Sequence, residues 1–369
     1  MATHQVPSVA PRIYTRVLRK PDGRELFLYG RQPIEAVQAP PGAARRGRGG
    51  AHLRWHPLRG EWIVYAGHEA HAPPSPAWDR FAATTDPEVL TEVPAGTWDV
   101  AVFECLHSAL GTHPGSPPPP RALVPTAPCG GHCEVVVFAQ DPATSLGALP
   151  LDHLALVLAV IAERTRVLGA RPDVQYVLPF ENRGAEVGAT SAHPHGQIYA
   201  YPFVPPLPAR ALELQRAHHQ ARGRGLVADL IDGEIAADRR TLEVRERAVA
   251  WVPAFARWPY EIWVAPRHAV PSLDALSDGE REDLAVCLRA SLRRLDALWR
   301  RPMPYVLSIQ QAPAKGAHPY AHVHIEIYPW LCRPDRPTYL AATEVAAGAF
   351  TVDTLPETTA AELRGVVVP

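Results

Sequence analysis

The 369-residue chain lacks the features that mark several large classes of protein. It has no excess of charge of either sign, because its formal net charge is −1, so no overall field favours nucleic acid or an anionic membrane surface. No apolar run is long enough to span a membrane, and the N-terminus has no charged-then-apolar signal pattern. We therefore expect a cytoplasmic enzyme that binds neither nucleic acid nor membrane.

Cysteine is also scarce, with five residues and no Cys-x-x-Cys pair. The odd number argues against a disulfide framework, and the missing pair argues against a cysteine-based zinc ribbon. Cys133 opens an apolar run that is typical of a strand. We expect it to be buried rather than to bind a metal together with Cys129 and His132.

Proline, by contrast, is abundant, with 41 residues, about twice the usual frequency. Many of these prolines lie in Pro73–Pro76, Pro117–Pro120 and Pro202–Pro208, which we expect to be ordered loops. The one basic run, at residues 45–50, alternates arginine with glycine and is typical of a flexible linker.

The most informative segment is Ser191-Ala-His193-Pro-His195-Gly-Gln197. The proline should hold both histidines rigidly, while Gly196 would leave room for a ligand to approach the main chain. Imidazole is a neutral nucleophile near pH 7, and the Gln197 amide can donate to a phosphoryl oxygen without adding charge. This combination suits covalent catalysis at phosphorus. A metal site and a chance histidine-rich turn are the alternatives.

Two parts of the chain share one order of expected elements, which indicates a duplication. The first contains a strand at 133–138, a helix at about 151–168, a strand at about 174–180 and a strand at 197–201 that follows the histidines. The second contains a strand at 260–265, a helix from a capping box at Ser277 to about Trp299, a strand at 305–310 and a histidine-bearing segment at 321–328.

The histidine pairs strengthen the case for duplication. His195 follows Glu134 by 61 positions, and His324 follows Glu261 by 63. Alternation along a strand would place both histidines of each pair on one face. Further strands are expected at 26–29, at 61–65 after a turn from His56, and in a hairpin at 242–253. We predict an α+β fold of duplicated halves, each an antiparallel sheet with helices packed on it.

These motifs resemble the galactose-1-phosphate uridylyltransferase family, a branch of the histidine-triad superfamily that is built from two such repeats. The resemblance covers most of the chain, and the segments that carry it are Arg54–Val64, Phe180–Gly188, His193–Ala200, Trp258–Glu261 and His322–His324. The chain is identified as a divergent member. The expected organisation is a partly flexible N-terminal segment at 1–50, a first histidine-triad-like half at 51–202 with the nucleophile motif, and a second half at 203–369.

The resemblance implies a nucleotidylyltransferase that exchanges a sugar 1-phosphate with an NDP-sugar. In the family, the second histidine of His-Pro-His attacks the α-phosphorus of a UDP-hexose, so His195 would be the nucleophile of a ping-pong reaction with a nucleotidyl-histidine intermediate. Gln197 would hold a phosphoryl oxygen, and His193 completes the catalytic set. An NDP-sugar phosphorylase or hydrolase and a non-catalytic nucleotide-binding relative stay open as alternatives.

The resemblance also implies contacts to the substrates and a homodimer whose subunits complete each other's sites. Matching positions for the nucleotide, the phosphate and the hexose give the expected substrate-binding residues, which are Asn182, Gly188, Thr190, Ser191, Cys105, Glu344 and Tyr339. Cys105 stands where the family has a uridine-contacting asparagine, and Glu69 and Ala72 stand where arginines meet the diphosphate. These departures raise the hypothesis that the nucleobase or the leaving group differs from the family's.

The metals of the family are expected to be missing. Of the zinc ligands only His193 remains, because residues 76–90 contain no cysteine and Pro142 replaces a further histidine. We do not expect the His68 and His71 pair to replace them. For the second metal His322 and His324 remain, but the other ligand positions hold Gln310 and Ala211, with Glu213 two positions on. We therefore predict no metal or other cofactor, and a core role for His322 and His324.

Overall fold

The computed structural model describes residues 13–40, 51–66, 79–84, 90–105, 110–111 and 115–368. The basic run at 45–50, the prolines at 73–76 and the segment with His68, Glu69, His71 and Ala72 lie outside these ranges. Among the helices of the described part, none combines the length and the apolar character that a membrane crossing requires.

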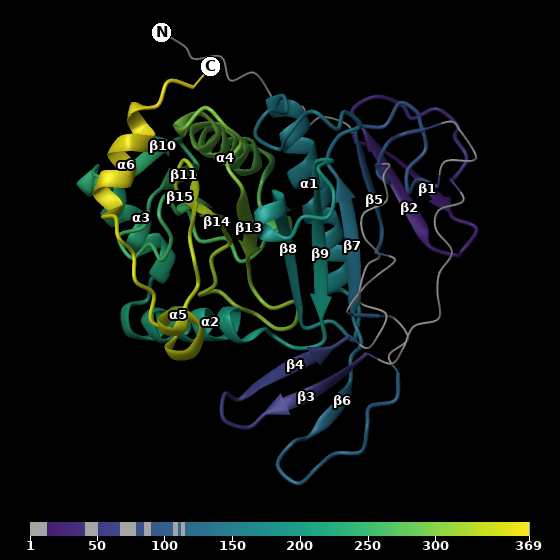
Figure 1. Cartoon of the computed structure of the whole chain (residues 1–369), viewed down its shortest axis with the longest axis horizontal. Helices are drawn as coiled ribbons and strands as arrows, with labels where there is room; N and C mark the ends of the chain where they lie inside the picture. The colour runs from purple at the N-terminus through teal and green to yellow at the C-terminus, as the bar shows by residue number, and fades with distance from the viewer. Residues whose placement is uncertain are drawn as a thin grey trace.

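A single sheet of eleven strands runs through the molecule (Figure 1). Its order is β1-β2-β5-β7-β9-β8-β13-β14-β12-β11-β10. The strands from the first part of the chain are β1 (Tyr14–Arg19), β2 (Glu25–Gly30), β5 (Val100–Glu104), β7 (His132–Val137), β8 (Tyr176–Arg183) and β9 (His195–Tyr201). Those from the second are β10 (Thr241–Val244), β11 (Ala248–Trp251), β12 (Ile262–Pro266), β13 (Tyr305–Gln310) and β14 (His324–Pro329).

The two halves meet at the antiparallel pair of β8 and β13, where Phe180 lies opposite Ser308. On either side of this pair the strand order is mirrored, since β9, β7 and β5 follow β8 just as β14, β12 and β11 follow β13. All strand pairings within this sheet are antiparallel. The predicted α+β class with antiparallel strands in both halves is therefore confirmed.

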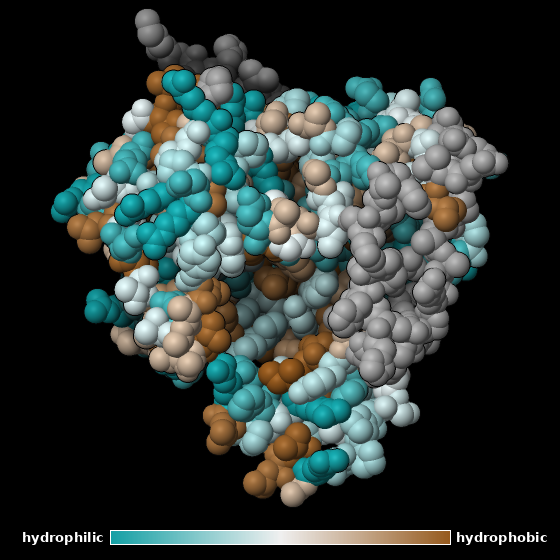
Figure 2. Space-filling model, in the orientation of Figure 1, coloured by the Kyte–Doolittle hydropathy of each residue, from teal (hydrophilic) through white to brown (hydrophobic). Residues whose placement is uncertain are grey.

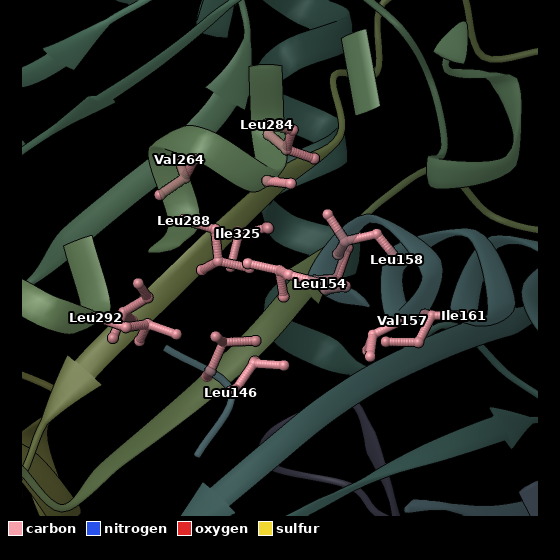
Figure 3. Packing of buried hydrophobic residues seen from close by; sticks show 14 of the residues in the cluster. Leu146, Leu154, Val157, Leu158, Ile161, Val264, Leu284, Leu288, Leu292 and Ile325 are labelled. Carbon is pink, nitrogen blue, oxygen red and sulfur yellow. The ribbon is translucent and has the colours of Figure 1, made fainter. Parts of the chain in front are cut away.

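One helix from each half covers the same face of the sheet. These helices are α1 (Leu151–Gly169) and α4 (Asp278–Leu298). Their apolar stripes recur at helical spacing and meet over the strands, with Leu154 and Val157 on one side and Leu288 and Leu292 on the other (Figure 3). The predicted capping box is present. Ser277 Oγ accepts from the Glu280 amide at 3.3 Å, and the Glu280 carboxylate accepts from the Ser277 amide at 2.9 Å.

Two further helices cover the other face of the second half. They are α2 (Pro206–Arg222) and α3 (Leu226–Ala237). Val227 and Ile231 of α3 pack against Trp251 of the sheet. The expectation of a loop throughout Pro202–Pro208 was wrong, because α2 begins at Pro206. Proline fits the first turn of a helix, where its missing N–H would have no partner.

The remaining elements lie around the eleven-stranded sheet and the helices that cover it. A three-stranded sheet of β4 (Glu61–Tyr65), β3 (His52–His56) and β6 (Thr126–Pro128) projects from the body (Figure 1). The other elements are η1 (Ala185–Val187), η2 (Leu273–Ala275), β15 (Leu331–Arg333), β16 (Arg336–Pro337), α5 (Ala342–Ala347) and α6 (Pro356–Gly365). The predicted strands near 26–29 and 61–65 and the hairpin at 242–253 are confirmed, whereas β1, β3 and β5 were not predicted.

The glutamates that we used to align the two halves are not equivalent. Val137 pairs with His195, and the register of β12 with β14 brings Ala265 opposite His324, so Glu134 corresponds to Ile262. Glu134 lies on the helix-covered face and accepts two hydrogen bonds from Arg164 of α1, whereas Glu261 lines a cavity on the other face. The mirrored strand order, rather than the pair of Glu134 and Glu261, supports the duplication.

Glu181 provides a test of the junction between the halves. This β8 residue is buried and accepts from Tyr305 of β13 at 2.8 Å, and burial raises its pKa to about 7. Because the folded pKa lies above the unfolded one, the stability that Glu181 contributes is present at low pH and lost as pH rises to about 7. Relative to wild type, Glu181→Gln should therefore gain about 2–3 kcal/mol in free energy of unfolding between pH 4.5 and pH 8. Urea unfolding at both pH values measures this, and an equal difference at the two would contradict it.

Candidate active site

His195 is the first residue of β9, on the sheet face opposite α1 and α4. Its ring is oriented by a hydrogen bond, in which Nδ1–H donates to the His193 carbonyl at 2.8 Å. The lone pair therefore remains on Nε2. Burial, and after it the charge of Arg80, lower the pKa of His195. His195 is thus a fixed, neutral imidazole at pH 7.

Arg80 and Phe81 form a wall beside this imidazole that sequence reasoning missed. The Phe81 ring lies 4.9 Å from the His195 ring, and the Arg80 guanidinium lies 4.9 Å above the Phe81 ring. Phe81 is buried at the same time against Phe103 of β5. No sequence motif marks Arg80 and Phe81, because an arginine next to an aromatic residue is common on protein surfaces. Only the folded chain brings this positive charge to the nucleophile.

The interpretation of Gly196 as a point of ligand approach was wrong. Gly196 faces the helix-covered side of the sheet, where an added Cβ would lie 2.7 Å from Phe138 Cζ and 3.0 Å from the Phe180 carbonyl oxygen. The glycine is required because the core has no room for a side chain here. Tight packing behind Gly196 supports His195 from the rear.

Two adjoining cavities open at His195. One of about 190 Å³ and one of about 170 Å³ share Asn182, Thr190 and His195 in their walls. Gly188, Cys105 and Gln197 line the smaller, together with Arg80, and Ser191 and His193 line the larger. The structure therefore brings most of the predicted substrate residues to the nucleophile. Figure 2 shows the hollowed face of the molecule above the small β3–β4–β6 sheet.

Local conformation explains several of these positions. Gly188 has a φ of 81° and ends the short helix η1 in a left-handed conformation, which glycine adopts without cost. Ser191 Oγ accepts from the His193 amide at 3.2 Å and so closes the turn that leads into β9. Ser191 therefore shapes the loop as well as lining the cavity.

Tyr339, which is exposed, and Glu344, which is half-buried, line neither cavity. Tyr339 is 70 % exposed. The Glu344 carboxylate accepts from the amides of Ala341 and Thr351, at 3.0 Å and 3.2 Å. Within one chain the structure does not bring these two residues to His195, and their sugar-binding role stays a prediction.

The second half repeats the frame of the site but not its chemistry. His324 Nδ1 bonds to the His322 carbonyl at 2.8 Å, as His195 does to His193. However, Glu326 occupies the position equivalent to Gln197, and its carboxylate lies 3.4 Å from His324 Nε2. This carboxylate lies against the ring nitrogen that is equivalent to His195 Nε2, and its negative charge would repel a phosphoryl group. The adjacent cavity of about 280 Å³ is therefore unsuited to phosphoryl transfer.

Neither histidine pair fits the metal that the family implies. Both ring nitrogens of His193 already face oxygen atoms, Asp79 Oδ2 at 2.6 Å and the Ala139 carbonyl at 2.7 Å. In the second half one nitrogen of His322 bonds to the Pro266 carbonyl at 2.8 Å, and the Glu326 carboxylate lies 3.4 Å from His324 Nε2. Within the described ranges no group of three or more His, Cys, Asp or Glu side chains could hold a metal ion.

The neutral state of His195 can be measured through its reactivity. Because Arg80 helps to keep the imidazole neutral, Arg80→Ala should move the pH at which His195 loses reactivity upward by about half a unit. The rate of carbethoxylation of the His195 peptide, followed by mass spectrometry between pH 4.5 and pH 8, measures this. Arg121→Ala, which removes an exposed arginine, is the control. An unchanged or lower midpoint in Arg80→Ala would refute the assignment.

The packing behind the nucleophile gives a second test. Gly196→Ala should lower the free energy of unfolding by about 1–3 kcal/mol, because overpacking forces the Phe138 ring or the strand to move. Gly365→Ala is the matched control, since nothing lies within 4 Å of its added Cβ. Denaturant unfolding compares the two, and equal stability of both variants would show that the site tolerates a side chain.

Comparison with known proteins agrees with this geometry. The family described as galactose-1-phosphate uridyl transferase, N-terminal domain, matches residues 99–205, and its C-terminal domain matches residues 211–365. The galactose-1-phosphate uridylyltransferase of Thermotoga maritima is 30% identical over 85% of this chain and 97% of its own.

Solved structures agree as well. One described as the structure of uridylyltransferase has a TM-score of 0.77 and 31% identity, covering 85% of this chain and 97% of that chain. The ADP-glucose phosphorylase of Arabidopsis thaliana shares the fold, with a TM-score of 0.65 and 21% identity over 87% of this chain and 100% of that chain. With a family match over most of its length and the His-Pro-His-Gly-Gln motif in place, this chain belongs to the galactose-1-phosphate uridylyltransferase family of nucleotidyltransferases.

Proposed function

We propose that the chain moves a nucleotidyl group from an NDP-sugar to a sugar 1-phosphate through a covalent intermediate on His195. In the first step His195 Nε2 forms a bond to the α-phosphorus, and the bond from that phosphorus to the oxygen of the leaving sugar 1-phosphate breaks. In the second step a phosphate oxygen of the incoming sugar 1-phosphate attacks the same phosphorus, and the P–N bond breaks. The imidazole returns to its neutral state.

The observation that carries this proposal is the free lone pair on Nε2 of a buried imidazole. The Nδ1–H bond to the His193 carbonyl fixes the tautomer, and the lowered pKa keeps the ring unprotonated. Such a group attacks phosphorus without first losing a proton. The same hydrogen bond stabilises the positive charge that develops on the ring when the P–N bond forms.

The groups around His195 support phosphoryl binding. Arg80 lines the cavity and supplies a positive charge beside His195. The family has arginines at the positions that hold Glu69 and Ala72 in this chain. Gln197 lies two residues after His195 in β9, so the two side chains project from the same face of the sheet. The Gln197 amide can donate to a phosphoryl oxygen. A fixed cation and a neutral donor beside one nucleophile suit the charge that spreads over the phosphoryl oxygens during transfer.

The sugar side of the reaction depends on residues that lie away from His195. The expected hexose contacts, Glu344 and Tyr339, line neither cavity at His195 in the single chain. We infer that a homodimer brings these residues to the cavity of the partner subunit. Cys105 in the cavity wall offers a nucleobase no amide group, so the base specificity is proposed to differ from that of relatives with asparagine there.

Intact-mass spectrometry after incubation with a panel of NDP-sugars tests the proposal. We expect a nucleotidyl adduct on the wild type that is absent from His195→Ala, and the added mass identifies the base. The matched control is His324→Ala, which removes the equivalent histidine of the second half and should keep the adduct. No adduct with any donor, or an adduct that survives in His195→Ala, would contradict the assignment.

The isolated adduct then distinguishes the acceptors. Exposure to hexose 1-phosphates, to inorganic phosphate and to buffer alone separates a transferase from a phosphorylase or a hydrolase. Transfer to a hexose 1-phosphate at least ten times faster than to phosphate or water is expected. Faster release by phosphate or by water would replace the transferase assignment with the corresponding alternative.

A further inference from the structure

His193 is held at both of its ring nitrogens. Its Nδ1 lies 2.6 Å from a carboxylate oxygen of Asp79, and its Nε2 lies 2.7 Å from the Ala139 carbonyl oxygen. The His193 side chain is fully buried, so water does not compete for either contact. The ring therefore joins the turn at Asp79 to the loop that follows β7.

The second half supplies an internal comparison. His322, the counterpart of His193, bonds through Nε2 to the Pro266 carbonyl at 2.8 Å, which repeats the contact of His193 with Ala139. Its Nδ1 is buried and has no hydrogen-bond partner within the described residues. The carboxylate of Asp79 is therefore an addition to the first half, the half that carries the nucleophile.

Asp79 also organises the wall of the active site. Its other carboxylate oxygen accepts from the Phe81 amide at 3.0 Å, and its carbonyl accepts from Ala82 at 3.1 Å. One side chain thus shapes the turn that carries Arg80 and Phe81 and joins this turn to the nucleophile motif. Burial raises the pKa of Asp79, but its hydrogen bonds to His193 and to Phe81 bring the net value below the ordinary one.

We propose that Asp79 is a positioning residue whose contact with the His193 ring replaces the metal cross-link of the family. A zinc ion would need a lone pair on His193, and both nitrogens already face oxygen atoms. The contact instead joins the Asp79 turn to the His-Pro-His segment and keeps Arg80 and Phe81 against His195.

Hydrogen–deuterium exchange gives a direct readout of the positioning, and it does not depend on any substrate. In Asp79→Ala, which removes the carboxylate from both His193 and the Phe81 amide, peptides that cover residues 79–84 and 191–197 should exchange several times faster than in wild type. His193→Asn should also speed exchange in the Asp79 turn. Unchanged exchange of both segments in Asp79→Ala would overturn the proposal.

Metal content and kinetics complete the test. The purified wild type, incubated with zinc and passed over a desalting column, should hold less than one tenth of an equivalent. A stoichiometric ion that His193→Asn removes would overturn the proposal. The kinetic readout rests on the proposed function: Asp79→Asn should form the His195 adduct about 10–100 times more slowly, and Asp79→Glu should recover part of that rate. Asp173→Asn, at an exposed ion pair, is the control.

The two parts of the experiment fail in different ways. If no NDP-sugar forms an adduct but exchange in the two segments depends on Asp79, the proposed function fails and the positioning role of Asp79 stands. If the adduct forms at the wild-type rate in Asp79→Asn while the protein stays folded, the positioning role of Asp79 is refuted and the function stands.

Discussion

The antiparallel pairing of β8 with β13 is the contact on which the rest of the molecule depends. It joins two similar half-sheets into one, and it lets α1 and α4 share a single core on one face. An isolated half would expose a row of unpaired backbone groups along this edge and would leave the apolar stripe of its helix partly uncovered. His195 and His324, at the starts of β9 and β14, are therefore held on a common, rigid support.

Each half uses this support to orient one imidazole through the same device, a hydrogen bond from Nδ1 to the carbonyl two residues earlier. What differs is the environment of the other nitrogen. In the first half a neutral amide and an arginine lie nearby, whereas in the second half a glutamate reaches the nitrogen itself. The change from amide to carboxylate, together with the arginine, gives two equivalent histidines different surroundings at the same ring nitrogen.

Much of the fold followed from periodicity, because the long helices α1 and α4 carry strong apolar stripes and α4 begins with a complete capping box. The nucleophile motif was equally legible, since His193, His195 and Gln197 are adjacent in sequence. Asp79, Arg80 and Phe81 were not predictable, because their role comes from tertiary contact with residues more than a hundred positions away. Gly196 was misread for a related reason: the sequence shows a missing side chain but not which face of the strand requires its absence.

The carboxylate beside His324 has a consequence for how such a chain can change over evolutionary time. In an assembly of two identical subunits, every substitution appears at both sites, so neither site can be altered while the other is kept. Covalent joining of the halves removes this restriction. One nucleophile can stay under selection while the equivalent pocket, still shaped by the same strands, is free to acquire a different lining. The cavity beside His324 has a different lining of this kind, with Glu326 at the position that Gln197 holds in the first half.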